Sequence, residues 1–335
     1  MTIPVITFFN NKGGVGKTTL VYHVAWMLSD LDYRVTAVDL DPQGNLSAAF
    51  LEDSRLEELW PEYQHPPTIF GALRPLKIGT GDIDQPLLES ISDQLTLIPG
   101  DMALSEFEDD LSQVWPKCLD RDERAFRVIS AFWRVMQCGA KNHNANIILV
   151  DLGPNLGAIN RAALIASDSV IIPLCPDLFS LQGLRNLGPT LRTWREGWKQ
   201  RLKANPVTDL MLPSGEMNPV GYIVMQHSVR SDRPVKSYDR WIARIPDTYR
   251  SYVLDETVDE TSVDETSVVE EDECCIAMLK HYRSLMAMAQ ESRKPIFHLK
   301  PADGALGAHT YAVKDAFADF KRLSLEVASR SGVIP

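Results

Sequence analysis

Residues 10–19 have the sequence NNKGGVGKTT, a spacing of glycines, lysine and threonine that is typical of a phosphate-binding loop. Glycines let successive backbone N–H groups turn toward an anion, and the start of a following helix adds a partial positive charge. In such a loop Lys17 reaches the β- and γ-phosphates, and the Thr18 hydroxyl binds Mg²⁺. The predicted nucleotide contacts come from Gly13, Gly14, Val15, Gly16, Lys17, Thr18 and Thr19.

The flanking sequence predicts the elements that must position this loop. The apolar run from Ile3 to Phe9 precedes it and has the character of a buried strand. Apolar residues after the loop fall on one face of a helix, namely Leu20, Val21, Val24, Ala25 and Leu28. A strand, a glycine-rich loop and a helix in this order are the setting in which the motif binds phosphate.

Acidic residues follow two further predicted strands. Residues 34–39 end in Asp39, with Asp41 two positions later, and the apolar run 147–151 ends in Asp151. Acidic side chains at the carboxyl ends of parallel strands point into the ligand crevice of an open sheet. Asp151 would therefore hold Mg²⁺ through its water shell.

Other segments predict the rest of an α/β fold. Phe126, Ile129, Trp133 and Met136 recur at helical spacing, which indicates the core face of one helix. A last helix near the carboxyl end has balanced charges on its polar face, which favours core packing over a membrane surface. Further strands are predicted at residues 95–98, 169–173 and 220–225.

Composition restricts the class of protein. The chain has 335 residues, 44% of them hydrophobic, which is enough for one large α/β core or two smaller ones. Its five cysteines show no C-x-x-C spacing, so a disulfide framework or an iron–sulfur site is not expected. No apolar run approaches 18 residues and no basic leader is apparent. We expect a cytoplasmic protein.

Charge is distributed unevenly along the chain. Residues 251–273 contain ten Asp or Glu and no Lys or Arg, which accounts for most of the net charge of −11. This segment, 251–273, includes an acidic repeat at 255–267, and we expect it to be a flexible solvating loop; shielding of a basic face by DNA mimicry is the alternative. Residues 185–250 hold twelve Lys or Arg against six Asp or Glu. Such an excess suits a DNA-facing surface, although solvated helices give similar counts.

The phosphate loop departs from the standard pattern at its start, because Asn11 replaces the first glycine and Lys12 follows. This form resembles the deviant Walker A motif of the ParA/Soj/MinD family of P-loop ATPases. Residues 38–45, VDLDPQGN, resemble the second motif of ParA proteins almost letter for letter, and residues 173–184 also resemble ParA. Residues 151–157, DLGPNLG, are similar to the family's DTPPSLG and depart from it at Leu152, Gly153 and Asn155.

The resemblance implies a single P-loop domain over residues 1–335, with a mostly parallel sheet flanked by helices. Insertions are expected at about 51–94 and 185–219. In the family, the residue matching Lys12 crosses a dimer interface to the partner's nucleotide, and the residue matching Asp41 helps to position the attacking water. The resemblance thus implies Lys12, Lys17 and Asp41 as catalytic residues, and Thr18, Asp39 and Asp151 at the magnesium site.

The family also implies a DNA contact at Arg192, which lies in a predicted basic helix. Arg230 and Arg233 are further candidate phosphate contacts, on sequence grounds alone. A solvated helix face is the alternative for Arg192. Contacts of this kind would be independent of DNA sequence and sensitive to salt.

The expected function is that of an ATPase which dimerises with Mg-ATP, binds DNA non-specifically and partitions or positions DNA or other cargo. Its hydrolysis would be slow alone and stimulated by a ParB-like or other partner, and the ATP form would associate with the nucleoid. The alternative is a nucleotide-gated regulatory or scaffold subunit of a multi-gene system, such as one that responds to foreign DNA. The expected insertions favour additional partners.

Overall fold

The central element of the protein is a sheet whose strand order is β3-β4-β2-β5-β1-β6-β7-β8 in the computed structural model, which describes residues 2–63, 65–225, 240–257 and 269–334. Neighbouring strands run parallel, except that β3 pairs antiparallel with β4. The strands of these residues are β1 (Val5–Phe8), β2 (Val35–Asp39), β3 (Glu89–Ser90), β4 (Leu95–Ile98), β5 (Ile147–Asp151), β6 (Ser169–Leu174), β7 (Asn218–Met225) and β8 (Cys275–Leu279).

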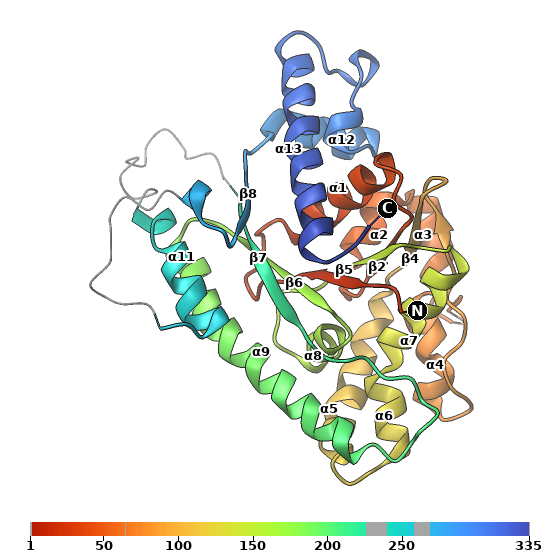
Figure 1. Cartoon of the computed structure of the whole chain (residues 1–335). Coiled ribbons are helices and arrows are strands. Elements are labelled where there is room, and N and C mark those ends of the chain that lie inside the picture. The colour runs from red at the N-terminus through yellow and green to blue at the C-terminus, as the bar shows by residue number, and fades with distance from the viewer. Residues whose placement is uncertain (1, 64, 226–239, 258–268, 335) are drawn as a thin grey trace.

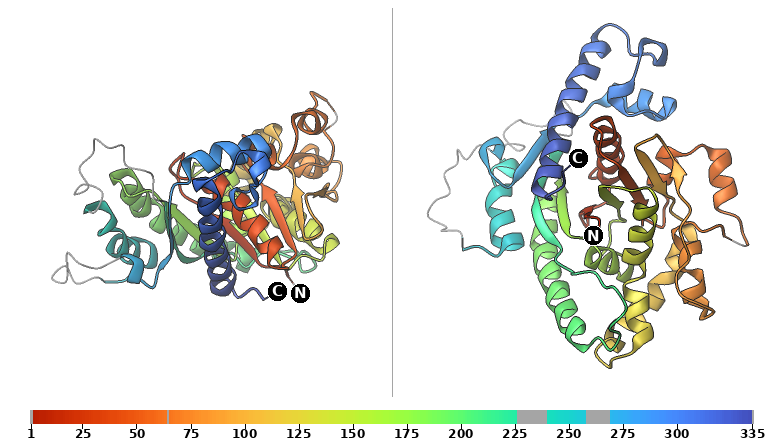
Figure 2. Two further views of the ribbon diagram at one scale, coloured as in Figure 1. Left: turned by 90° about the horizontal axis from the view of Figure 1, so that it is seen from above. Right: turned by 45° about the vertical axis from the view of Figure 1, so that its right-hand side comes forward.

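Helices cover both faces of this sheet (Figures 1 and 2). One face packs against α1 (Lys17–Asp30), α2 (Asn45–Phe50), α3 (Asp53–Leu59), α12 (Arg283–Ser292) and α13 (Ala308–Arg330). The other packs against α4 (Ile69–Ile78), α5 (Phe107–Lys117), α6 (Glu123–Ile129), α7 (Ala131–Asn142), α8 (Ala158–Ile165), α9 (Leu178–Ala204) and α11 (Ile245–Thr248). The short helical turns are η1 (Met102–Glu106), η2 (Tyr249–Leu254), η4 (Val269–Glu271), η5 (Ile296–His298) and η6 (Pro301–Asp303).

The strand sequences account for this layered arrangement. In β1, Val5 belongs to the core on one face of the sheet, whereas Ile6 and Phe8 belong to the core on the other. Successive side chains of a strand point to opposite faces, so a parallel sheet covered on both sides needs almost continuous apolar runs. The predicted α/β fold with a mostly parallel sheet is confirmed.

The helix predicted around residues 126–136 is two helices. Phe126 and Ile129 lie in α6, Trp133 and Met136 lie in α7, and all four side chains are buried as expected. The break falls at Ser130, whose hydroxyl donates a hydrogen bond to the Phe126 carbonyl at 2.7 Å. A serine side chain that competes for helix carbonyls in this way bends or ends a helix.

The segments expected as insertions contain regular structure. Within 51–94, helix α4 begins after Thr68, whose hydroxyl accepts a hydrogen bond from the Gly71 N–H at 3.2 Å, and α4 buries Phe70 and Leu73 in the core. The second segment, 185–219, begins inside the 27-residue helix α9. Both segments therefore help to build the fold, and their status as insertions stays a prediction.

Figure 2 shows the described N- and C-terminal ends on the same side of the molecule. Across the described residues, no helix has both the length and the apolar character needed to cross a membrane.

Candidate active site

The predicted site residues meet because three neighbouring strands end at the same edge of the sheet. In the register of the sheet, Asp151 of β5 lies opposite Phe8 of β1 on one side and opposite Asp39 of β2 on the other. The phosphate loop follows β1 directly, so it begins beside both carboxylates. This arrangement matches the expectation that the acids at the strand ends surround the loop.

The loop itself needs glycine at two positions. Gly14 and Gly16 have φ angles of 72° and 88°, in the left-handed region that other residues rarely adopt. A Cβ at Gly16 would also lie only 3.0 Å from the methyl of Met225. The buried side chain of Val15 anchors the loop between these two turns, and α1 begins immediately afterward.

Lys17 lies inside the loop. Its amine donates hydrogen bonds to the carbonyls of Asn10 at 3.1 Å and Lys12 at 3.3 Å, and the residue is only 7% exposed. Burial lowers the pKa of Lys17, and the nearby carboxylates Asp151 and Asp41 partly oppose this effect. A buried cation held only by carbonyls can transfer its hydrogen bonds to an incoming phosphate.

The residues predicted for magnesium are brought together. Thr18 donates a hydrogen bond from Oγ1 to Asp151 Oδ2 at 2.7 Å, whereas the buried Oδ1 of Asp151 has no partner among the described residues. Burial, reinforced by the negative charges of Asp39 and Asp41, raises the pKa of Asp151. A cation at this edge of the sheet would bind the unpartnered Oδ1 of Asp151 and favour the charged form of its carboxylate over the protonated form.

The donor set fits Mg²⁺ rather than a metal held by protein ligands alone. Among the described residues, no group of three or more His, Cys, Asp or Glu could hold a metal ion. Mg²⁺ characteristically takes one or two carboxylates or hydroxyls and completes its shell with water and substrate phosphates. The Thr18 hydroxyl and the Asp151 carboxylate are groups of this kind, and their roles as ligands stay a prediction.

Asp39, opposite Asp151 on β2, has both carboxylate oxygens occupied by hydrogen bonds within the protein. Its Oδ2 accepts hydrogen bonds from the Ser47 N–H at 2.8 Å and hydroxyl at 2.7 Å, and its Oδ1 accepts from the Asp41 N–H at 3.2 Å. Burial raises the pKa of Asp39 to about 6. The geometry suits an indirect, supporting role for Asp39. Ser47, which follows the second motif by two residues, was not predicted from the sequence.

Asp41 faces the loop after β5. Its Oδ1 accepts a hydrogen bond from the Gln43 N–H at 3.0 Å, and a Cβ at Gly153 would lie only 3.1 Å from the same oxygen. The departure from the family pattern at Gly153 therefore allows Asp41 to approach this loop closely. Pro154 in turn packs on the phosphate loop, where a Cβ at Gly13 would lie 3.8 Å from it.

Lys12 lies at the opposite side of the loop. Its Nζ pairs with Asp177 Oδ2 and stands 5.8 Å from the centre of the Phe179 ring. Within a single chain the side chain thus binds residues at the start of α9. Its predicted role across a dimer interface stays a prediction.

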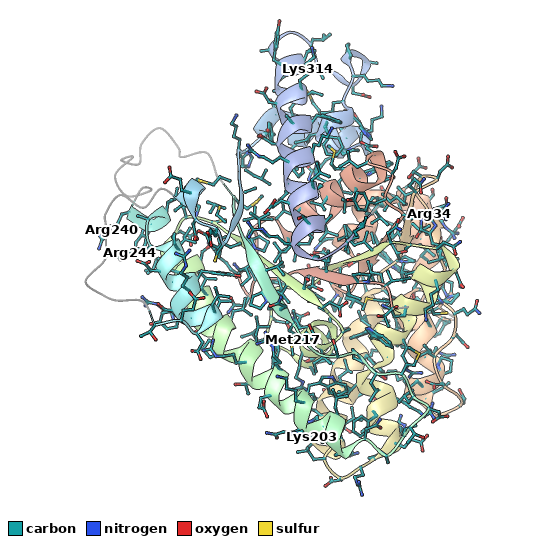
Figure 3. The ribbon with its side chains drawn as sticks, viewed as in Figure 1. Arg34, Lys203, Met217, Arg240, Arg244 and Lys314 are labelled. Atoms are coloured by element: carbon teal, nitrogen blue, oxygen red, sulfur yellow. The ribbon has the colours of Figure 1, made fainter. Side chains whose placement is uncertain are left out.

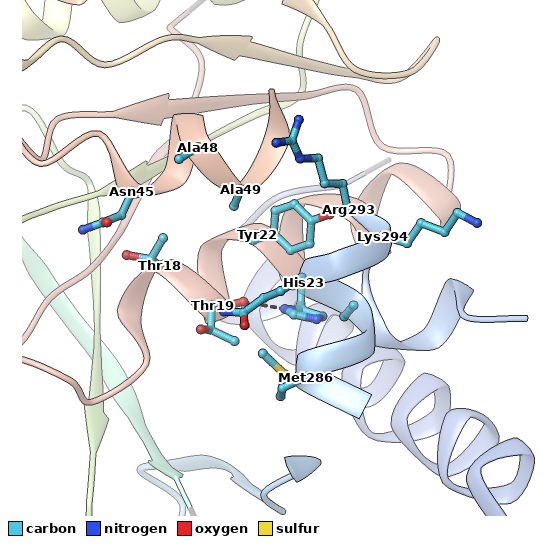
Figure 4. A pocket seen from close by; sticks show the side chains of 12 residues that line it. Thr18, Thr19, Tyr22, His23, Asn45, Ala48, Ala49, Met286, Arg293 and Lys294 are labelled. Atoms are coloured by element: carbon cyan, nitrogen blue, oxygen red, sulfur yellow. Dashed lines mark hydrogen bonds between the residues drawn. The ribbon is translucent and has the colours of Figure 1, made fainter. Parts of the chain in front are cut away.

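Two cavities adjoin the first turn of α1, and both are bordered by Thr19 and Met286. The smaller cavity has a volume of about 110 Å³ and is lined mainly by apolar side chains. Besides Thr19 and Met286, its lining includes Gly16, Met225, Leu279, Tyr282, Ile296 and Phe320. The larger, of about 460 Å³, lies between α1, α2 and α12, and Figure 4 shows its lining. No residues were assigned to a nucleotide base from the sequence, because residues 226–234 do not match the pattern that the family places after the strand predicted at 220–225.

The predicted DNA contacts are only partly described. Arg192 of α9 donates from Nη1 to the Tyr252 carbonyl at 2.6 Å and pairs through Nη2 with Asp255 at 3.2 Å. Arg230 and Arg233 lie outside the described residues. Figure 3 places further cations on the same side of the molecule, with Lys203 at one end of α9 and Arg240 and Arg244 near the other.

The close packing of η2 on α9 explains why Arg192 meets Tyr252. A Cβ at Gly188, one turn before Arg192, would lie 1.9 Å from the Tyr252 carbonyl oxygen. Glycine at this position lets the two backbones touch, and the carbonyl of Tyr252 then comes within reach of the guanidinium. Arg192 is therefore bound to the start of the acidic segment and is not a freely solvated side chain.

A glycine-rich loop at a helix N-terminus, flanked by a buried lysine, a threonine and strand-end carboxylates, defines a P-loop ATPase site. Residues 3–204 match the protein family described as an AAA domain. The chain belongs to the ParA/Soj/MinD family of P-loop ATPases, as the sequence predicted.

The relatives are similar to this chain over part of their length. A protein of Rhizobium rhizogenes that carries the name replication protein A is 32% identical over 189 residues, which cover 54% of this chain and 42% of the relative. The chromosome partitioning protein ParA of Myxococcus xanthus is 28% identical over 214 residues, or 63% of this chain and 65% of that protein. The alignments thus span between 42% and 65% of the length of these relatives.

The fold is shared over a longer range. The structure of a McdA variant from Cyanothece in complex with ATP aligns with 100% of this chain and 98% of its own, with a TM-score of 0.64. At 15% sequence identity this similarity concerns the fold.

Proposed function

We propose that this protein is a Mg-ATP-dependent ATPase that dimerises with ATP, binds DNA without sequence preference, and partitions or positions DNA or another cargo. Hydrolysis is slow in the isolated protein and is stimulated by a partner protein. The observation that carries the proposal is the convergence of Lys17, Thr18, Asp41 and Asp151 at one edge of the sheet. The family membership and the ATP complex of the McdA variant support it.

The residues of the phosphate loop would bind the triphosphate. Lys17 exchanges the carbonyls of Asn10 and Lys12 for the β- and γ-phosphates, and the loop N–H groups take the remaining oxygens. Thr18 and Asp151 would hold Mg²⁺, which when bound neutralises charge on the phosphates. The base would enter the small apolar cavity beside Gly16, Thr19 and Met225.

The DNA-binding surface would be the side of the molecule that carries α9 and α11. It offers cations from α9, and Arg240 and Arg244 lie just before α11; a dimer would present two copies of them to one duplex. Phosphate contacts of this type position a protein on DNA but carry no sequence information. The cargo and the stimulating partner would then decide the biological role.

Asp41→Ala should slow hydrolysis by roughly 100-fold or more while leaving ATP binding intact, because a positioned acid–base group contributes about that much or more to the rate. With hydrolysis slowed, the ATP dimer should accumulate. Steady-state phosphate release and sedimentation velocity with Mg-ATP measure the two effects on the same sample. Fast turnover by a folded Asp41→Ala protein would remove Asp41 from the reaction.

Lys12→Ala should separate nucleotide binding from dimerisation. The monomer should keep ATP affinity, since Lys17 and the loop N–H groups remain, but it should lose ATP-dependent dimers and turnover. Sedimentation with a non-hydrolysable ATP analogue and Mg²⁺ measures the dimer, with Lys314→Ala, at the outer end of α13, as the control for loss of a lysine (Figure 3). An unimpaired Lys12→Ala dimer would contradict the role of Lys12 across the interface.

A further inference from the structure

Asp177 has two separate tasks, one for each carboxylate oxygen. Its Oδ1 accepts a hydrogen bond from the Ser180 N–H at 2.8 Å and so caps the N-terminus of α9. Its Oδ2 pairs with the Nζ of Lys12. One side chain therefore joins the phosphate loop to the helix that carries Arg192.

The surrounding contacts hold the loop against the start of α9. Asn10 donates from Nδ2 to the Pro173 carbonyl at 2.7 Å, at the end of β6. A Cβ at Gly183, in the second turn of α9, would lie 3.0 Å from Asn11 Oδ1. The Lys12–Asp177 pair closes this contact at its outer rim, where the two side chains are 27% and 38% exposed.

We propose that Asp177 is a positioning residue that retains Lys12 within its own chain and thereby opposes dimerisation until nucleotide binding compensates for its loss. The inference rests on the proposed function, in which Lys12 reaches the nucleotide of a second copy. The pair holds the Lys12 ammonium at the start of its own α9, so the side chain leaves Asp177 when it extends to the partner subunit's nucleotide. Two such ion pairs must open for each dimer formed.

The same carboxylate makes α9 sensitive to the position of Lys12. While the pair is closed, the lysine offsets the negative charge at the first turn of α9. When Lys12 leaves, the carboxylate interacts with the positive N-terminal end of the helix without a competing cation. Dimerisation is thereby coupled to the first turn of the helix that bears Arg192.

Asp177→Asn tests the inference because it removes the charge and keeps the cap. Asparagine is as good an N-cap as aspartate, so Ser180 retains its acceptor. Loss of a partly exposed ion pair changes an equilibrium constant by about threefold. Because two such pairs open for each dimer, the association constant for dimerisation should rise about tenfold in Asp177→Asn. It is measured with Mg²⁺ and a non-hydrolysable ATP analogue. Glu196→Gln makes the same change of charge on the exposed side of α9 and should leave the constant unchanged.

A second measurement reports on the ion pair itself. The rate at which acetic anhydride modifies Lys12 in the absence of nucleotide, read by mass spectrometry against the exposed Lys199, should rise about threefold in Asp177→Asn. Asp177→Ala should show the same rise together with a lower melting temperature, since it also loses the cap. A residue that only caps α9 would change the melting temperature and not the reactivity of Lys12.

The outcomes separate this inference from the proposed function. If the wild-type protein dimerises with the analogue but Asp177→Asn changes neither the dimerisation constant nor the reactivity of Lys12, the inference is wrong. If the wild-type protein does not dimerise at all, the proposed function fails. In that case the inference fails with it, even if acetylation confirms the ion pair between Lys12 and Asp177.

Discussion

Replacing Lys17 by alanine should abolish ATP turnover and weaken nucleotide binding, with a decrease of at least about 100-fold in the rate of hydrolysis. Lys17 is the one described lysine whose amine lies buried inside the phosphate loop, next to Asp41 and Asp151. A preorganised donor aimed at developing negative charge commonly contributes about 100- to 1000-fold, and no other cation of the described loop is placed to replace it. Phosphate release and equilibrium binding of a fluorescent ATP analogue measure the two effects.

The same substitution should leave the fold intact. Burial already disfavours the charged amine of Lys17, so its removal relieves a desolvation cost and opens no apolar cavity. Circular dichroism and the melting temperature serve as controls, and Lys199→Ala, on the exposed face of α9, controls for loss of a lysine. Normal turnover by a well-folded Lys17→Ala protein would refute the assignment of the site.

Removal of the charges of Arg192, Arg230 and Arg233 should abolish DNA binding without removing ATP-dependent dimers. Arg192→Gln is preferable to a charge reversal, because glutamine can still donate to the Tyr252 carbonyl whereas glutamate would face both that oxygen and Asp255. Each arginine that no longer binds a DNA phosphate should lower the slope of log K against log salt by about 0.9. In the triple variant Arg192→Gln, Arg230→Gln and Arg233→Gln, DNA binding should fall below detection at moderate salt.

The structure provides a matched control for Arg192. Arg124 of α6 also donates to two backbone carbonyls, those of Leu76 and Lys77, so Arg124→Gln removes the same charge from a similar setting elsewhere. Fluorescence anisotropy with a labelled duplex measures DNA binding, and sedimentation with ATP measures the dimer. Equal losses of DNA binding in Arg124→Gln and Arg192→Gln would mean that binding depends on net charge alone.

The acidic segment should not contribute to DNA binding. Asp255→Asn, or deletion of 255–267, should leave DNA binding unchanged or strengthen it in the same assay.

The nucleotide site was predictable from sequence because its residues follow strands in short motifs. The loop at residues 10–19 and the acids Asp39 and Asp151 each come directly after an apolar run, and Asp41 follows two positions after Asp39. The rule that ligands bind at the carboxyl ends of parallel strands then places them together. Ser47 was missed, because nothing in a single serine shows that it will bond to a buried carboxylate eight residues earlier.

The interactions made by long-range folding were not predictable. The apolar run of β8, Cys275–Leu279, is short and follows an acidic segment, so it was not identified as a strand, and the small cavity that it borders was missed with it. The ion pair between Asp177 and Lys12 depends on how β6 and α9 meet the phosphate loop. The same holds for Arg192, whose carbonyl partner lies 60 residues away and approaches only because position 188 is glycine.

The most direct test of the central claim is duplex binding by the Asp41→Ala protein with Mg-ATP, measured at low and at moderate salt and without nucleotide. The proposed function predicts binding to duplexes of unrelated sequence at low salt, only with ATP. For about four phosphate contacts, affinity should fall about 100-fold between about 50 and 200 mM salt. If no binding appears even at low salt, the DNA-binding mechanism is contradicted, and a nucleotide-gated regulatory or scaffold subunit becomes the better account.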